Sequence, residues 1–324
     1  MKKIKLPKDE AAHSKGSEWW YFNGHLKSNE NKEYGFMISF FKIDMLKNKP
    51  KLFLFPIKTG YLVHSHLSDI TKKEFFPHYE HFLKMPYEKF TEKNQLFNHY
   101  RSTLLKEIKK GVYHLKFNNK PYQFDLVITA KKPAVFHNRK GYINIGKDKS
   151  YYYSFTDMEV KGTITRSLEN PVKVQGTAWM DHQWGNFDLH NKQWDWMSIK
   201  LNNNYELMAF KILDKTDAKN QYYASLINEN GKLTKIKDLK LKSIKRWKSK
   251  KTGILYPIQW KLRIPSKKIN LTIKPDFNNQ EMHDGILMYW EGSCSVSGMQ
   301  NKKRVKGRAY MELVGHETVK SKLF

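Results

Sequence analysis

Two six-residue stretches of this chain match each other: GTAWMD at residues 176–181 and GRAYME at residues 307–312. An earlier pair of stretches also matches, with WYFNGHL at residues 20–26 echoed by WMSIKL at residues 196–201. These matches fall in the same order in both halves of the chain. Ordered self-similarity of this kind is typical of duplicated structural units, so the sequence predicts two related domains.

The spacing between the matches locates an insertion in the first half. Trp196 follows Trp20 by 176 residues, whereas Tyr289 follows Tyr153 by only 136, so the first half carries about 40 extra residues. The stretch at residues 76–111 is the natural place for them. It lacks a period of two, and its apolar residues near the end recur at helical spacing before Gly111. We therefore expect residues 94–110 to be partly helical.

Elsewhere the pattern is that of strands. Short apolar runs or alternating apolar and polar residues are bounded by Gly, Asn, Asp or Pro, which is typical of an all-β fold. The expected strands span residues 19–26, 34–44, 61–67, 112–117, 124–130, 151–165, 172–180, 194–201, 206–213, 222–227, 258–264, 268–273, 285–297 and 305–314. The resulting organisation is an N-terminal extension at residues 1–17, a first β domain at residues 18–188 and a second at residues 189–324, as antiparallel barrels or sandwiches.

The charge and composition narrow the class of protein. The 324 residues carry 59 Lys and Arg against 31 Asp and Glu, a formal net charge of +28, and 40% hydrophobic residues, which is enough for a real core. Lysine is spread along the chain, and only residues 235–251 approach a basic cluster, so specific nucleic-acid binding is not expected. The even spread favours a solvated surface with a compositional bias toward lysine. If the charge has a role, the more economical one is to hold the protein near anionic lipid headgroups.

The cysteine content and the apolar runs limit the redox chemistry and the location. The single cysteine, Cys294, excludes an internal disulfide and a cysteine metal cluster. No run reaches the roughly 18 apolar residues of a membrane span, and residues 1–10 lack a signal-peptide core. We expect a cytoplasmic protein as the chain is written, peripheral to a membrane at most, or a secreted or periplasmic one if a signal peptide was removed. The oligomeric state is not predicted.

Four motifs carry a resemblance to a known family: EWWYFNGHL at residues 18–26, GTAWMDHQWG at residues 176–185, WDW at residues 194–196 and YWEG at residues 289–292. Together they resemble the AttH/hydroxyneurosporene synthase family. This resemblance implies two tandem lipocalin-like barrels and, in the best-known members, carotenoid 1,2-hydratase activity; other relatives hydrate prenyl groups or act as pericyclases. Two hypotheses follow: a hydro-lyase or isomerase acting on an isoprenoid-like lipophile, or a carrier that binds a hydrophobic ligand without chemistry.

Hydration of an unactivated alkene requires a carboxylic acid that stays protonated near neutral pH, with aromatic faces around the developing cation. Asp181 fits the role of this acid. His182 fits the role of a residue that orients Asp181, or of the base that activates the incoming water. The expected walls of that pocket are Trp179, Trp184 and Tyr153. Alternatively, Asp181 is a turn former after a strand, as the matching position of Glu312 suggests. A catalytic Asp181 requires a raised pKa, whereas a structural one accepts several backbone N–H bonds and has a depressed pKa.

Other substrate-binding candidates lie in the tryptophan-rich motifs. Period-two alternation separates Trp19 and Tyr21 from the residue between them, so one face lines an interior. Polar or aromatic partners for a ligand are then expected at Glu18, Trp19, Tyr21, His25, Trp194 and Trp196. A surface ion pair, a core histidine and aromatic packing are the alternative roles of these residues.

Motifs for other chemistries are weak or missing. His64 and His66 share one strand face, but two histidines without a spaced third ligand are weak evidence for a metal. The sequence contains no G-x-S-x-G elbow and no Walker or Rossmann glycine pattern. We therefore expect no metal ion and no other cofactor, and a lipophilic small molecule as the ligand.

Overall fold

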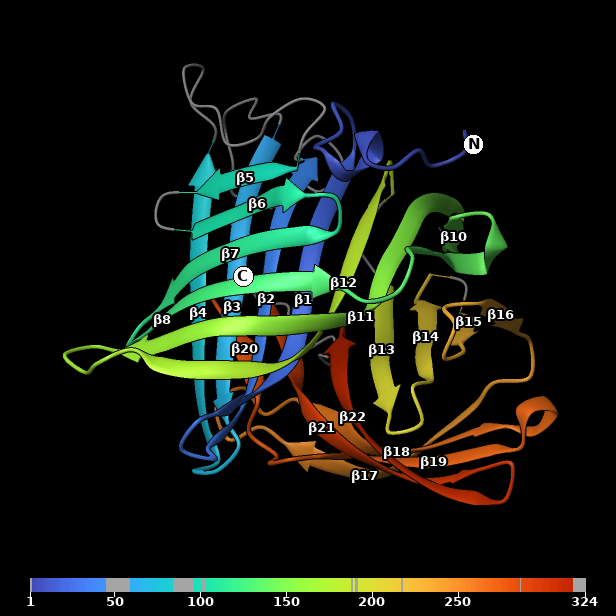
Figure 1. The fold of residues 1–324 in the computed structure, drawn as a ribbon. Coiled ribbons are helices and arrows are strands. Elements are labelled where there is room, and N and C mark those ends of the chain that lie inside the picture. Colours follow the sequence, from blue (N-terminus) through green and yellow to red (C-terminus); the bar gives the residue numbers. More distant parts are fainter. Residues whose placement is uncertain are drawn as a thin grey trace. The chain divides into compact units, whose positions relative to one another are not determined.

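The structure is a computed structural model that describes residues 2–44, 59–83, 96–100, 103–187, 189, 192–216, 218–285 and 287–316. It is an all-β protein (Figure 1). Within these residues the helical segments are three short 3-10 turns: η1 at Lys8–Glu10, η2 at His137–Arg139 and η3 at Pro265–Lys267. No helix in the described part of the chain is long and apolar enough to cross a membrane.

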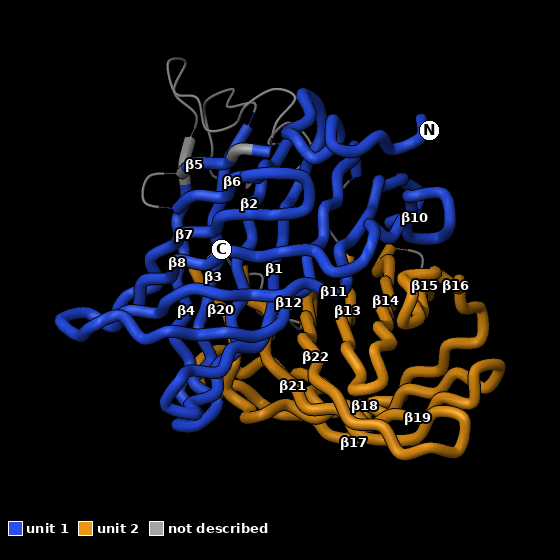
Figure 2. Tube along the Cα trace, in the orientation of Figure 1, with its two compact units in different colours: residues 1–190 blue, residues 191–324 orange. Residues whose placement is uncertain are grey.

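The chain divides into two compact units, residues 1–190 and residues 191–324, shown in separate colours in Figure 2. Each unit contains its own curled antiparallel sheet and its own hydrophobic core. Two lipocalin-like β units in tandem are therefore confirmed as the fold class.

The sheet of the first unit has the strand order β4-β3-β2-β1-β12-β11-β8-β7-β6-β5, with β9 and β10 paired to β11. Its strands are β1 Ser17–Ser28, β2 Glu33–Asp44, β3 Thr59–Asp69, β4 Glu74–Leu83, β5 Phe97–Tyr100, β6 Thr103–Lys109, β7 Val112–Asn119, β8 Tyr122–Ala130, β9 Val135–Phe136, β10 Tyr142–Ile145, β11 Asp148–Arg166 and β12 Val172–Gly185.

The sheet of the second unit has the order β16-β15-β14-β13-β22-β21-β19-β18-β17, with β20 paired to β21. Its strands are β13 Lys192–Leu201, β14 Glu206–Asp214, β15 Lys219–Ile227, β16 Leu233–Ile236, β17 Lys240–Lys248, β18 Leu255–Ile264, β19 Ile269–Pro275, β20 Glu281–His283, β21 Met288–Gln300 and β22 Lys303–Val314. In each unit the first four strands form a meander, and the first of them also pairs with the last strand of that unit. The two predicted repeats therefore have the same topology.

The ladders correct the alignment of the two halves by one residue. Tyr21 lies opposite Asp181 in β1 and β12, and Trp196 lies opposite Glu312 in β13 and β22. Trp196 is therefore the counterpart of Tyr21, not of Trp20. Because side chains alternate between faces, this shift changes the face of the sheet to which each matched residue belongs.

The repeated glycines are required by close strand contact. A Cβ added to Gly176 would lie 1.9 Å from the carbonyl oxygen of His25, and one added to Gly307 would lie 2.2 Å from that of Lys200. Both backbones leave no room for a side chain, so any substitution would push neighbouring strands apart. This shared requirement explains why the two matching motifs both begin with glycine.

The expected strands are confirmed, because each of the fourteen predicted segments overlaps an observed strand. The predicted helical insertion is wrong. Residues 103–109 form β6, which pairs with β7, and residues 97–100 form β5; residues 84–95 lie outside the described part of the chain. Leu105 is fully buried whereas Ile108 is 55% exposed, so the neighbouring leucines imitate a helical period in a strand whose pairing is non-local.

Candidate functional site

Asp181 and His182 lie on opposite faces of β12. Tyr21 is the cross-strand neighbour of Asp181, and Trp20 is the neighbour of His182. Trp20 belongs to the core cluster of the first unit, so His182 faces that core while Asp181 faces away from it. The structure thus separates the predicted acid from the residue expected to orient it. The strand also continues to Gly185, so Asp181 lies within β12 and is not a turn former after it.

The Asp181 carboxylate accepts hydrogen bonds from three side chains. Its Oδ1 accepts from Trp179 Nε1 at 2.6 Å and from the Ser154 hydroxyl, and its Oδ2 accepts from the Tyr152 hydroxyl at 2.8 Å. His137 Nε2 lies 2.6 Å from Ser154 Oγ, which extends the chain of contacts. His137, Ser154 and Asp181 therefore form a relay along which a proton can move, with two aromatic side chains beside the carboxyl.

Two irregular backbone segments position Ser154 and His137 near Asp181. A β-bulge interrupts the pairing of β11 with β12 between Phe155 and Met158, directly after Ser154. Bulges commonly redirect side chains next to functional sites. His137 begins the η2 turn, in which Asn138 and Arg139 both have positive φ, 55° and 63°. A left-handed conformation at Arg139 costs free energy, which the surrounding turn must offset to hold His137 against Ser154.

Burial raises the pKa of the Asp181 carboxyl. Desolvation raises its pKa from 3.8 to about 7, against the lowering effect of the hydrogen bonds from Ser154, Trp179 and Tyr152. Burial also lowers the pKa of His137 to about 3, so this imidazole is neutral. A carboxyl with a pKa near 7 is populated in both forms at neutral pH, as a group that gives and recovers a proton must be.

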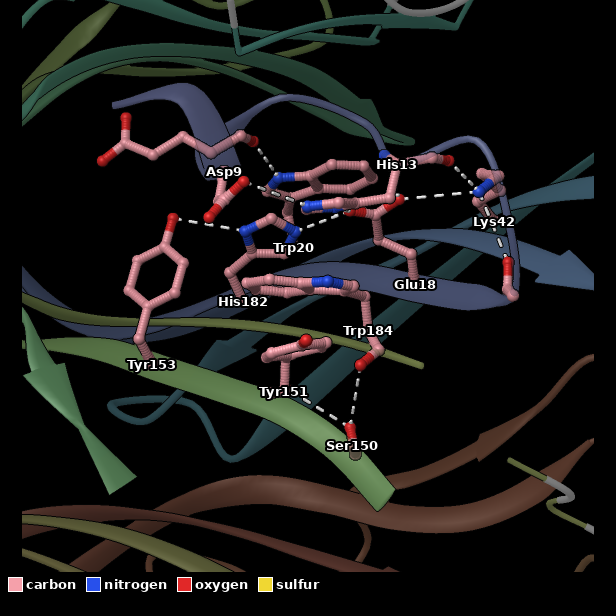
Figure 3. A network of polar contacts seen from close by, with 12 residues as sticks. Asp9, His13, Glu18, Trp20, Lys42, Ser150, Tyr151, Tyr153, His182 and Trp184 are labelled. Carbon is pink, nitrogen blue, oxygen red and sulfur yellow. Dashed lines mark hydrogen bonds and ion pairs between the residues drawn. The ribbon is translucent and has the colours of Figure 1, made fainter. Parts of the chain in front are cut away.

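On the core face, His182 belongs to a second polar network (Figure 3). Its Nε2 donates to Glu18 Oε1 at 2.8 Å, and its Nδ1 lies 3.2 Å from the hydroxyl of Tyr153. His13 Nδ1 lies 2.6 Å from the same Glu18 oxygen, and the backbone N–H of His13 donates to Oε2. Glu18, His182 and Tyr153 are fully buried.

Hydrogen-bond donors keep the Glu18 carboxylate ionised. Burial alone would raise its pKa, but the hydrogen bonds from His13 and His182 outweigh that effect and lower the pKa to about 2. Burial lowers the pKa of His182, and the neighbouring Glu18 opposes that shift. Lys42 Nζ lies 3.6 Å from Glu18 Oε2 and also donates to the carbonyl oxygens of His13 and Gly16. The network is an ionised carboxylate among a buried ammonium and two imidazoles.

The same three groups have the spacing of a metal site. The ligand atoms of His13, Glu18 and His182 all lie within 4.8 Å of one another. The Lys42 ammonium already supplies a positive charge to this carboxylate, and each imidazole directs a ring nitrogen at it, so the residues fit a closed hydrogen-bond network better than a divalent cation.

Stacked rings surround the network. His13 stacks on Trp184 with centroids 4.2 Å apart, His182 stacks on Trp20 at 4.8 Å, and Tyr151 stacks on Trp184 at 4.9 Å. The indole of Trp20 donates to the backbone carbonyl of Glu10. The residues before β1 are thus fixed to this end of the first unit, and Trp184 and Tyr153 line the environment of His182, not that of Asp181.

The remaining predicted residues are divided between the two units. Tyr21 is buried on the face of Asp181, and His25 lies further along β1 on the same face, partly exposed. Trp19 contacts Phe187 with centroids 5.3 Å apart. The candidates of the second unit both lie on β13, with Trp194 partly exposed and Trp196 buried.

Three residues of the Asp181 network are not predicted by the sequence: Tyr152 and Ser154, which contact Asp181, and His137, which contacts Ser154. The tyrosine that the sequence predicts as a pocket wall is Tyr153, which the structure places on the face of His182. The bulge in β11 shifts the register so that Ser154 lies opposite Asp181, and Tyr152, two residues earlier on the same face, reaches the carboxylate. The signal in the sequence that could have found Tyr152 is the run of three tyrosines at residues 151–153, which places a ring on each face of the strand.

The fold and the site define a lipocalin-like β protein with a buried, weakly acidic carboxyl. The chain belongs to the AttH-like family, whose model matches residues 1–316. It is similar over 98% of both chains to the crystal structure of an AttH protein from Nitrosomonas europaea, with 26% identity and a TM-score of 0.86.

More distant solved structures share the fold. Kievitone hydratase from Nectria haematococca is 18% identical with a TM-score of 0.79, covering 96% of this chain and 93% of its own. CghA, in a structure with Sch210972, is 12% identical with a TM-score of 0.57, covering 92% of this chain and 88% of its own. No curated protein sequence matches this chain.

Proposed function

We propose that this protein adds water across a carbon–carbon double bond of a lipophilic, isoprenoid-like substrate, with Asp181 as the general acid. The observation that carries the proposal is the state of the Asp181 carboxyl. It is buried, its pKa is raised to about 7, and the hydrogen-bond donors that surround it are side chains. A carboxylate whose role was to stabilise a turn would have backbone donors and a depressed pKa.

The reaction has a simple proton balance. The Asp181 O–H proton forms a C–H bond at the less substituted alkene carbon, and the π electrons leave a tertiary cation at the other carbon. Water forms the C–O bond there and returns one proton to the Asp181 carboxylate. Trp179 and Tyr152 are the aromatic side chains beside the carboxyl, and stabilisation of the cation by an aromatic ring grows when water is excluded. Ser154 and His137 supply a path for the returning proton.

The relatives support the hydratase class and leave the substrate open. One structural neighbour is itself named a hydratase, and the chain covers nearly all of it. At 18% identity this likeness concerns the fold, so the reaction and substrate rest here on the Asp181 site.

Incubation with acyclic carotenoids such as lycopene or neurosporene in deuterated water should test the reaction. We expect a product heavier than its substrate by one water, with one deuterium bound to carbon and one in an exchangeable hydroxyl. Mass spectrometry before and after back-exchange distinguishes the two positions. If the protein binds these lipophiles tightly and no member of a panel of isoprenoid alkenes gains water, the protein is a carrier and the proposal fails.

Substitution of Ser154 by alanine should shift the pH dependence of the reaction. Ser154 donates to the ionised Asp181 carboxylate, so its loss raises the Asp181 pKa further above 7. Since the acid must be protonated, the alkaline limb of the pH–rate profile should move up by about one unit, with a lower maximum because the relay is broken. Ser150→Ala, on the same strand, is the matched control and should leave the limb unchanged. An unshifted limb in Ser154→Ala would separate Ser154 from the acid.

A further inference from the structure

The positive charge of this protein is concentrated on one face of the second sheet. The strand segments 240–248, 255–264, 269–275, 295–300 and 303–309 together contain twelve Lys and Arg residues and no Asp or Glu. Eleven of the twelve are exposed, and the remaining Arg308 is partly exposed. The lysines that look evenly spread along the sequence are therefore gathered by strand pairing.

Strand register arranges six of these twelve cations in two rows. The first row passes from β17 to β22 through Lys240, Arg263, Asn270, Met299 and Arg304. The second row crosses the same strands through Lys242, Lys261, Thr272, Ser297 and Lys306. We call these ten residues the cationic face.

Like charges lie directly opposite one another on the cationic face. Lys240 is paired with Arg263, and Lys242 with Lys261. Such cross-strand pairs are destabilising in the isolated protein, and the ten residues of the cationic face include no acid. Of the acids beside this face, Asp276 binds Arg308 at 2.7 Å, and Asp238 accepts hydrogen bonds from Ser266 and also interacts with Lys240, which lowers the Asp238 pKa.

Protection of a sheet edge does not account for this arrangement. Lysine on an edge strand such as β17 prevents pairing with other chains. Arg263 on β18 and Lys306 on β22 lie on strands with partners on both sides, where no edge needs protection. Nor does a general lysine bias explain it, because the corresponding face of the first unit balances its charges: Lys116 pairs with Asp125 at 2.8 Å, and Lys161 with Glu159 at 3.1 Å.

We propose that the cationic face is a docking surface for an anionic lipid bilayer. A sheet surface presenting two rows of cations suits phosphate and carboxylate headgroups, and the hydroxyls of Thr272 and Ser297 lie between the cations as further donors. Met299 is exposed in the middle of the first row, where it can enter the headgroup region. A single-stranded nucleic acid would instead require aromatic platforms for base stacking, and the ten residues include none.

This inference concerns where the protein works and stands apart from the chemistry proposed for Asp181. Docking would hold the protein at the place where lipophilic substrates dissolve. Because the interaction is with surface charge, it should weaken with salt as the Debye length falls to about 8 Å at physiological ionic strength.

The test is co-sedimentation of the full chain with phosphatidylcholine vesicles that contain or lack phosphatidylglycerol. Binding should require phosphatidylglycerol and decrease with salt. Each cation near such a surface strengthens binding on the order of fivefold, so removal of four should weaken it on the order of 600-fold. The test variant is Lys242→Gln/Lys261→Gln/Arg263→Gln/Lys306→Gln. The control, with the same loss of net charge on exposed lysines of the first unit, is Lys72→Gln/Lys120→Gln/Lys131→Gln/Lys147→Gln.

The control should bind like the unsubstituted protein, and both variants should keep its melting temperature. Equal weakening in the two variants would show that net charge alone acts, and would overturn the proposal. So would a result in which vesicles do not bind while duplex or single-stranded oligonucleotides do, measured by fluorescence anisotropy. Asp181→Asn should bind vesicles normally, so a failed hydration assay and a failed docking assay remain distinguishable.

Discussion

Asp181→Asn should reduce the rate of alkene hydration by about 10²- to 10⁴-fold, the usual contribution of a positioned general acid. The substitution keeps the size of the side chain and an oxygen that accepts from Trp179, and it directs an NH2 group at the Tyr152 hydroxyl, but it removes the proton that must reach the alkene. Product should be measured by mass spectrometry as a gain of one water. Retention of the full rate by Asp181→Asn would refute the general-acid role.

The same variant should be more stable than the unsubstituted protein at alkaline pH. The folded-state pKa of Asp181 is raised, from 3.8 to about 7, so its stabilising contribution is complete below pH 3.8 and is lost as pH rises through 7. That loss amounts to about 4 kcal/mol, because each pKa unit is worth about 1.4 kcal/mol. Urea unfolding at pH 5 and pH 8 should therefore show a smaller decrease with pH in Asp181→Asn. The control is Asp125→Asn, which removes a carboxylate from the surface of β8 and should leave both the rate and this difference in place.

Glu18→Ala should produce the largest loss of stability, about 3–5 kcal/mol at pH 7. The substitution is costly because it leaves the buried Lys42 ammonium and the ring nitrogens of His13 and His182 without the acceptor that they share. Chemical unfolding followed by tryptophan fluorescence is a direct measurement, since Trp20 and Trp184 stack on these imidazoles. Glu30→Gln, which breaks an exposed ion pair with Lys32, should cost less than about 1 kcal/mol.

The pH dependence separates the charge of Glu18 from its packing. Its folded-state pKa is depressed, from 4.5 to about 2, so it contributes stability above pH 4.5 that disappears as pH falls through 2. This contribution is about 3 kcal/mol. Glu18→Gln should lose it at pH 7 and show a flatter decline between pH 4.5 and 2. Equal stability of Glu18→Gln and the unsubstituted protein at neutral pH would mean that the carboxylate charge is not stabilising.

The two acids illustrate opposite uses of burial on one pair of strands. Glu18 is surrounded by donors and a cation, and its ionised form stabilises the fold. The side chains that donate hydrogen bonds to Asp181 are Trp179, Tyr152 and Ser154, which are all uncharged, and its ionised form is disfavoured. A carboxyl kept at a cost in stability is what a catalytic acid requires, because the same desolvation that destabilises the protein keeps the proton available at neutral pH.

The sequence by itself determined the strands, the two units and the family. Period-two alternation is a local property, and residues 172–180 or 206–213 show it without reference to any partner strand. The two glycines that begin the repeated motifs are visible in the sequence as part of the repeat, although the close contact that requires them is with a neighbouring strand. Asp181 could be selected for the same reason: an acid within an aromatic, apolar run is unusual wherever that run lies.

Tertiary structure decided which residues act together. Residues adjacent in sequence point to opposite faces of a strand, so Asp181 and His182 join different networks although they are neighbours in the chain. The bulge in β11 gives Asp181 the partner Tyr152 in place of Tyr153, and the pairing of β6 with β7 overrides the helical spacing of its leucines. Strand register and bulges depend on contacts between residues far apart in sequence, and no local pattern specifies them. For that reason Asp181, the proposed acid, could be selected from the sequence, whereas its contacts with Ser154 and His137 and the cationic face required the folded chain.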